Sequence, residues 1–215
     1  MYNKVVESII ENKLIVIARG VEKEKVIPLT QAMYDGGIRL LEITYDASKK
    51  VSDEETAETI RLIAEHFEGK MFIGAGTVLT TEQVELTYKA GGKFIISPNL
   101  DEAVIKKTRE LGMVSMPGAV TPTEIQLAHN YGASFVKLFP AGDLGPGYVK
   151  AVKAPLSHIK LTAVGGIDET NIPAYLKAGA SGFGIGTNIV DKKLIAANDF
   201  DGIRELAKRY VALVK

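Results

Sequence analysis

Short runs of apolar residues recur along the chain, separated by stretches in which apolar residues return every three or four positions. Short runs of this kind are typical of buried strands, and the longer spacing is typical of helices that bury one face. The sequence predicts eight strands, at 14–19, 39–44, 71–77, 93–98, 113–118, 135–140, 159–166 and 182–186. Eight strand–helix units in a chain of this length predict an α/β fold, a (β/α)8 TIM barrel.

Glycine-containing segments end most of the helical stretches and support this alternation. They read YDGG, YKAGG, ELG, NYG and KAGA, and glycine just past a helix is a common stop signal. Residues 2–12 predict an extra N-terminal helix that closes the lower end of the barrel, and residues 200–214 predict the last outer helix. A doubly wound open sheet is the alternative, but no G-x-G-x-x-G follows the first strand. We expect residues 1–215 to form a single barrel domain.

A lysine in the middle of the sixth predicted strand is the first candidate for chemistry. It lies in the segment SFVKLFPAG, where successive side chains point to opposite faces. Val136 and Leu138 suit the apolar side that faces the helices. Lys137 must then face the barrel interior, together with Phe135 and Phe139. Because lysine is almost never fully buried without a partner or a function, this position needs an explanation.

The same alternation in the second predicted strand turns a glutamate inward. Leu41 and Ile43 face the helices, so Leu40, Glu42 and Thr44 face the interior. Strands two and six lie on opposite walls of an eight-stranded barrel, whose interior is just wide enough for side chains to fill. We therefore expect the glutamate and the lysine to meet across the barrel.

Two interpretations of this pair are open. A buried ion pair could help to fix the strand register, although desolvation offsets much of its attraction. Alternatively, Lys137 forms a Schiff base and Glu42 moves protons. Burial beside Phe135 and Phe139 lowers the pKa of the lysine and so provides the neutral amine that attacks a carbonyl. Forming and breaking an imine requires proton transfers, which a carboxylate on the far wall can perform.

The composition disfavours several other classes of function. The chain has no cysteine, which rules out disulfides and thiolate nucleophiles, and its formal net charge is zero. No basic stripe indicates nucleic acid as a partner. The N-terminus is too polar for a signal peptide and no stretch is long enough to span a bilayer, so we expect a cytoplasmic protein without a membrane partner. His66, His129 and His158 are expected at the surface, and no histidine–carboxylate cluster has metal-binding spacing.

Glycine-rich segments after the seventh and eighth strands are candidates for phosphate binding. The segments AVGGID and GIGTN occupy the place where many barrels hold a phosphate. Gly165, Gly166 and Gly186 allow backbone N–H groups to approach an anion, and Thr187 adds a hydroxyl. Alternatively, these glycines only form tight turns.

Several motifs together resemble the bacterial 2-keto-3-deoxy-6-phosphogluconate (KDPG) / 4-hydroxy-2-oxoglutarate (KHG) aldolase family. They are GGIRLLEIT, IGAGTV, FIISPN, MPGAVTPTE, FVKLFPA and AVGGI, and their order and spacing cover nearly the whole chain. The resemblance implies that Lys137 forms the Schiff base, that Glu42 is the general acid/base and that Thr77 binds the pyruvyl carboxylate. It also implies a homotrimer active in carbohydrate metabolism, with no metal or organic cofactor.

Other residues in or near these motifs are candidates for substrate binding. Gly76 is expected to let the substrate approach the backbone, and Pro98 and Pro117 fall in the motifs of strands four and five. Some family members carry an arginine after the second strand, where this chain has Asp46. We expect Arg19, just beyond the first strand, to bind the carboxylate instead, because a buried carboxylate needs a positive partner. Asp46 could repel a phosphate or hydrogen-bond the hydroxyls of a sugar acid.

The predicted function is a class I aldolase that cleaves a 2-keto-4-hydroxy acid to pyruvate and an aldehyde. KDPG and KHG are the expected substrates, with the phosphorylated acid preferred. Two alternatives use the same barrel. One is a sugar-phosphate isomerase or epimerase with Glu42 as the base, and the other is an anion-binding barrel without catalytic activity.

Overall fold

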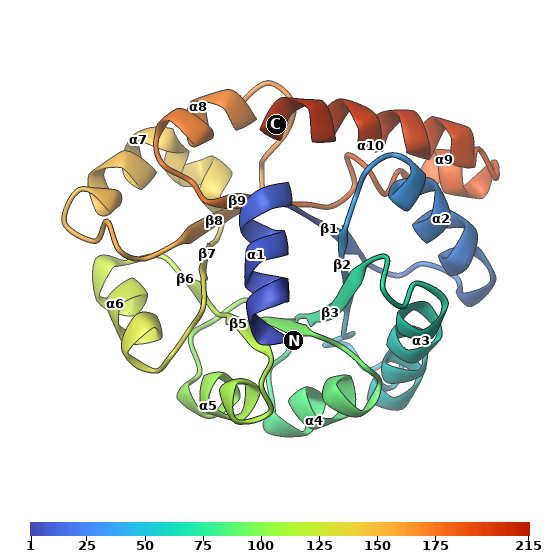
Figure 1. Cartoon of the computed structure of the whole chain (residues 1–215), viewed down its shortest axis with the longest axis horizontal. Helices are drawn as coiled ribbons and strands as arrows, with labels where there is room; N and C mark the ends of the chain where they lie inside the picture. Colours follow the sequence, from blue (N-terminus) through green and yellow to red (C-terminus); the bar gives the residue numbers. More distant parts are fainter.

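Parallel strands curl into a barrel with helices around its outside, as the computed structural model of residues 1–215 shows (Figure 1). The strands pair in the order β5-β4-β3-β2-β1-β9-β8-β7-β6, and every pair is parallel. The strands are β1 (Leu14–Ala18), β2 (Leu40–Thr44), β3 (Phe72–Gly76), β4 (Phe94–Ile96), β5 (Val114–Met116), β6 (Gly118–Ala119), β7 (Val136–Leu138), β8 (Leu161–Val164) and β9 (Gly182–Ile185).

Ten helices accompany these strands. They are α1 (Tyr2–Asn12), α2 (Lys23–Asp35), α3 (Asp53–His66), α4 (Thr81–Lys89), α5 (Glu102–Glu110), α6 (Pro122–Asn130), α7 (Ala141–Lys153), α8 (Ile172–Lys177), α9 (Lys192–Ala196) and α10 (Phe200–Val214). None of them is both long and apolar enough to cross a membrane. The predicted N-terminal helix and the predicted last outer helix are confirmed as α1 and α10.

The fifth predicted strand is divided by Pro117 into β5 and β6. Proline has no backbone N–H to donate to a neighbouring strand, so the ladder is interrupted there. The segment before the proline pairs with β4, and the segment after it pairs with β7. The two ends of the strand order are thus consecutive in the chain, and the sheet closes through them. The eight-position barrel is confirmed, and the open doubly wound sheet is wrong.

The predicted alternation of side chains is confirmed by two separate apolar cores. The larger core lies between strands and outer helices and contains Leu41, Ile43, Val136 and Leu138. The smaller core fills the barrel and contains Leu40 and Phe135, among other inward-facing strand residues. Lys137 and Glu42 therefore lie on the inner face of their strands.

Helix α1 closes the lower end of the barrel. It crosses the barrel opening in Figure 1, and its Val5 and Ile9 belong to the inner core, in contact with side chains such as Ile15, Phe94 and Phe135. Ile9 is 1% exposed, whereas the neighbouring Ile10 is 44% exposed. The helix thus buries one face against the barrel interior and leaves the other in solvent.

We expect Ile9→Ala to destabilise the barrel by about 2–5 kcal/mol, because it removes a fully buried aliphatic side chain and leaves a cavity. Chemical denaturation followed by circular dichroism measures the free energy of unfolding. Ile10→Ala is the matched control, for which we expect a change within about 0.5 kcal/mol. Equal losses in the two variants would contradict the role given to α1.

Candidate active site

Lys137 and Glu42 lie on opposite walls of the barrel, as the alternation predicts. Lys137 is the central residue of β7 and Glu42 is the central residue of β2. Three strand positions lie between β7 and β2 in each direction around the barrel: β8, β9 and β1 on one side, and the divided β5/β6, β4 and β3 on the other. Lys137 is only 8% exposed and Glu42 only 2%. The barrel interior therefore holds an amine and a carboxyl group in an environment that disfavours charge on both.

Burial is the largest influence on both groups. It lowers the pKa of the Lys137 amine, an effect that Glu42 opposes and that the positive charge of Arg19 reinforces. It also raises the pKa of the Glu42 carboxyl group, against the opposing influence of Lys137 and Arg19. Both shifts favour the neutral forms, which are a nucleophilic amine and a carboxylic acid able to donate a proton.

Glu42 is not paired as a structural ion pair would require. Its Oε2 atom is buried and has no hydrogen-bond partner. A buried carboxyl oxygen without a hydrogen-bond partner destabilises a protein. The Oε2 atom of Glu42 is therefore available to form a hydrogen bond with a substrate or a water molecule. This observation favours the chemical interpretation over a register-fixing ion pair.

Gly76 makes room for Glu42. It lies at the end of β3, and a Cβ atom added there would overlap the Oε1 atom of Glu42. The sequence predicts that this glycine lets the substrate approach the backbone; in the structure, the space that a Cβ atom would occupy is filled by the glutamate. Because Gly76 has no side chain, the carboxyl group of Glu42 can occupy this space.

The surroundings of the Lys137 amine are aromatic and narrow. Its Nζ lies 4.9 Å from the ring centroid of Phe139, which is partly exposed above it. On the two neighbouring strands its register partners are Gly118 and Thr162. Because one partner has no side chain and the other has a small one, Lys137 carries the longest side chain at this level of the barrel wall.

Arg19 and Thr77 come together at the upper mouth of the barrel. An Nη atom of Arg19 donates a hydrogen bond of 3.1 Å to Oγ1 of Thr77. Thr77 has a φ of 55°, which is unfavourable for a β-branched residue and is typical of functional sites. The side chains from β1 and β3 thus converge on one point and offer a guanidinium group and a hydroxyl to an anion.

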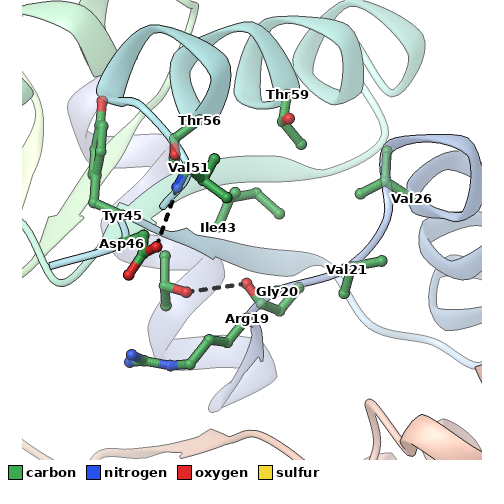
Figure 2. A pocket seen from close by; sticks show the side chains of 12 residues that line it. Arg19, Gly20, Val21, Val26, Ile43, Tyr45, Asp46, Val51, Thr56 and Thr59 are labelled. Carbon is green, nitrogen blue, oxygen red and sulfur yellow. Dashed lines mark hydrogen bonds between the residues drawn. The ribbon is translucent and has the colours of Figure 1, made fainter. Parts of the chain in front are cut away.

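Asp46 has a structural role in the loop after β2. Its carboxylate accepts hydrogen bonds from the backbone N–H groups of Ser48, Lys50 and Val51 and from the Ser48 hydroxyl. Hydrogen bonding to Ser48 is the main cause that lowers the pKa of Asp46 to about 2. Figure 2 shows the bond to Val51, beside a pocket of about 250 Å³ that Arg19 also lines. The carboxylate is therefore occupied by its own loop rather than free to bind a sugar.

The two candidate prolines contribute mainly through their carbonyl groups. Pro117 is buried, and its carbonyl accepts a 2.9 Å hydrogen bond from the backbone N–H of Lys137. The carbonyl of Pro98 lies against Gly118, the register partner of the lysine. Both prolines thus hold the wall that carries Lys137.

The glycine-rich loops after β8 and β9 present unpaired donors. The backbone N–H groups of Gly165, Gly166, Gly186 and Thr187 donate no hydrogen bond within the chain. Gly165 and Gly166 have φ values of 83° and 70°, a conformation in which side chains are disfavoured. Successive free N–H groups of this kind are suited to an anion.

Two asparagines that the sequence analysis missed shape these loops. The Nδ2 atom of Asn171 donates to the carbonyl of Gly166 at 2.8 Å, and that of Asn188 donates to the carbonyl of Ile167 at 3.2 Å. Asn188 is part of the GIGTN segment, so its motif was visible, but the partner of each amide was not. The three histidines are exposed, as predicted. No three histidine, aspartate or glutamate side chains gather as a metal site would require.

Comparison with known proteins agrees with this geometry. The model of the family "KDPG and KHG aldolase" matches residues 5–206. The chain is 38% identical over 180 residues to a probable 2-dehydro-3-deoxy-6-phosphogalactonate aldolase of Rhizobium meliloti, covering 83% of this chain and 82% of that one. It is 30% identical over 213 residues to the 2-dehydro-3-deoxy-phosphogluconate aldolase of Haemophilus influenzae, covering 99% and 97%.

A solved structure extends the likeness to three dimensions. The KDPG aldolase of Legionella pneumophila, with pyruvate captured at low pH as a covalent carbinolamine intermediate, superposes with a TM-score of 0.84 at 26% identity, over 97% of each chain. The chain belongs to the KDPG and KHG aldolase family. It is therefore a carbon–carbon lyase, and the isomerase and the inactive anion-binding barrel are set aside.

We expect Gly76→Ala to reduce the rate of aldol cleavage by roughly 10² or more, because the added methyl group displaces Glu42 and general acid–base catalysis is lost. Steady-state kinetics measures the effect, and circular dichroism checks that the barrel is folded. Gly147→Ala is the control, since an added Cβ there meets nothing within 4 Å. Full activity in the Gly76 variant would show that the position of Glu42 is unimportant.

Proposed function

We propose that the chain is a class I aldolase that cleaves a phosphorylated 2-keto-3-deoxy sugar acid to pyruvate and a three-carbon aldehyde phosphate. The observation that carries the proposal is the buried Lys137 opposite a buried Glu42 whose Oε2 atom has no partner. Family membership supports the reaction class, and the geometry supports the assignment of roles to particular residues.

Arg19 and Thr77 receive the substrate carboxylate in this proposal. Their hydrogen bond places a positive charge and a hydroxyl side by side at the mouth. A carboxylate bound there gains charge-assisted hydrogen bonds. The adjacent C2 carbonyl is then directed down into the barrel, toward Lys137.

Lys137 attacks the C2 carbonyl through its neutral amine. The new C–N bond forms as the C=O π bond breaks, the nitrogen gives up one proton and the carbonyl oxygen takes one up, which gives a neutral carbinolamine. Glu42, whose acid form burial favours by raising its pKa, donates a proton to the departing hydroxyl. Water leaves, the nitrogen supplies its electron pair, and a positively charged iminium remains. This sequence returns Glu42 to its carboxylate form.

The iminium then accepts the electrons of the broken carbon–carbon bond. A base, for which Glu42 as carboxylate is suited, removes the proton of the C4 hydroxyl. The C3–C4 bond breaks, the aldehyde leaves, and the electron pair moves into an enamine on Lys137. Protonation at C3 and addition of water to the iminium release pyruvate and regenerate the amine.

The loops after β8 and β9 are proposed to bind the phosphate. The free N–H groups of Gly165, Gly166, Gly186 and Thr187 support this assignment. The names of the relatives include both the phosphogalactonate and the phosphogluconate aldolases, and the identity is higher for the former, at 38% against 30%. We therefore propose the 6-phosphorylated acids as substrates, with the galactonate isomer to be tested beside KDPG. KHG has no phosphate and is expected to be the poorer substrate.

The proposal also includes the assembly and the location expected from the sequence. Residues 1–215 are treated as one aldolase domain, most of which the family model covers. A homotrimer is the form implied by resemblance to the family, and the cytoplasm is the location expected from the sequence. Light scattering of the purified chain distinguishes a trimer from a monomer directly.

We expect pyruvate and borohydride to label Lys137, because only an imine is reduced to a stable amine. Peptide mass spectrometry should place the added mass on the peptide that contains FVKLFP. The rate of labelling should depend on a pKa below that of an ordinary lysine, since burial disfavours the ammonium form. Labelling of Lys70, Lys93 or Lys160 instead would contradict the assignment.

Glu42→Gln is the matched variant for this experiment. When Glu42 is ionised, its negative charge raises the pKa of Lys137, so removal of the carboxyl group should move the inflection of the labelling profile to lower pH. Cleavage should fall by roughly 10²–10⁴ because the acid/base group is gone. An inflection at higher pH, or normal turnover, would mean that Glu42 has neither role.

We expect kcat/KM to be highest for the 6-phosphorylated acids, lower for their unphosphorylated analogues and for KHG. Gly166→Val should lower kcat/KM for the phosphorylated acids far more than for the others, because a side chain at a φ of 70° distorts the loop that presents the N–H groups. Equal losses on all substrates, or a preference of the unmodified enzyme for an unphosphorylated acid, would remove the phosphate site.

A further inference from the structure

A groove of about 520 Å³ opens at the upper rim between the loop after β1 and the loop after β9. Its lining includes Ile17, Arg19 and Lys25 from β1, the loop after it and α2, and Gly186, Thr187 and Lys192 from the loop after β9 and α9. The two loops are more than 160 positions apart in the sequence, yet Figure 1 shows α2 and α9 side by side.

The groove carries an excess of unpaired positive charge. Arg19, Lys25 and Lys192 are its cations and Glu22 is its only carboxylate. None of the ten ion pairs of the chain involves any of these four residues. The groove is therefore prepared for an anion that the chain itself does not supply.

Lys25 is held in place within this groove. It is half-buried, and its Nζ donates a 3.0 Å hydrogen bond to the carbonyl of Ile195 in α9. Two ammonium hydrogens remain for a further partner. This bond ties α2 to α9, so the position of Lys25 is fixed by two elements rather than by one mobile side chain.

The groove is continuous with the barrel mouth. Ile17 is the register partner of Glu42 on the neighbouring strand and faces the same interior. Arg19 lies two residues further along, and the free N–H groups of Gly186 and Thr187 form part of the wall. The groove therefore adjoins the strand face that carries Glu42 at the mouth of the barrel.

We propose that the groove binds the terminal phosphate of the substrate and that Lys25 and Lys192 determine the preference for a phosphorylated acid. The inference rests on the proposed function, and it adds two side chains to the backbone donors already described. A phosphate dianion bound between the N–H groups of Gly186 and Thr187 and the two ammonium groups receives donors from both sides. Arg19 is engaged with the carboxylate end, so the lysines are the cations left for the phosphate.

Lys192→Met tests the proposal, with Lys193→Met as the matched control. Both lysines are exposed on α9 and neither forms an ion pair, but only Lys192 lines the groove. We expect Lys192→Met to reduce the preference for a phosphorylated over an unphosphorylated acid, measured as the ratio of kcat/KM values, by about tenfold. Lys193→Met should leave this ratio as it is. Equal ratios in the two variants would overturn the proposal.

Two further measurements keep the test decisive. Inorganic phosphate should inhibit cleavage competitively, and its inhibition constant should rise by about tenfold in Lys192→Glu or Lys25→Met if folding, checked by thermal unfolding, is intact. An unaltered constant in both would overturn the proposal. Borohydride labelling by pyruvate separates the two levels of inference. If the enzyme is labelled but the lysine variants behave like the unmodified enzyme, only the phosphate-binding role of the groove is contradicted. If the enzyme is not labelled, the proposed function on which that role rests is contradicted.

Discussion

The burial of an amine and a carboxyl group without a direct pairing between them is the constraint on which the rest of this barrel depends. Two charges inside a protein are usually stabilised by mutual contact and by additional hydrogen bonds. Here Glu42 keeps a buried oxygen without a partner, and Lys137 has an aromatic ring as its neighbour. Burial of an unpaired charged group raises its free energy, so such a group tends to become neutral. In the proposed reaction, the neutral amine and the neutral carboxyl group are the forms that begin imine formation. A stability cost and a chemical requirement are therefore the same feature.

The scaffold around this pair is arranged to keep the two groups in place. Gly76 leaves the space that Glu42 fills, and the carbonyl of Pro117 holds the backbone of Lys137. Below them the barrel is filled by apolar side chains, and α1 packs across that end. The polar atoms thus lie between an apolar floor and an open mouth. A substrate can reach them only from the side where Arg19 and Thr77 stand.

The sequence predicts the barrel and the inward-facing pair of Glu42 and Lys137 because both follow from simple periods. A repeat of two along each strand assigns Glu42 and Lys137 to the interior, and eight strand–helix units place them on opposite walls. What it does not predict depends on contacts between distant segments. The contact of Gly76 with Glu42 joins two strands, and the groove of Lys25 and Lys192 joins loops from opposite ends of the chain. The hydrogen bonds of Asp46 are not predicted, for a different reason. Its partners are backbone N–H groups two to five residues further along the chain. A carboxylate that accepts hydrogen bonds from its own loop cannot be told from the sequence, which shows only residues that are common in turns.

Arg19 links substrate binding to the charge state of the lysine. In the free enzyme its positive charge adds to burial in lowering the pKa of Lys137, which favours the amine that attacks the carbonyl. A substrate carboxylate bound to Arg19 and Thr77 brings a negative charge to the same place and offsets that influence. The site then opposes a positive charge on the lysine nitrogen less strongly, at the stage when the iminium forms. A single cation at the mouth can thus support a neutral nucleophile before binding and a charged intermediate after it, because the substrate itself supplies the compensating charge.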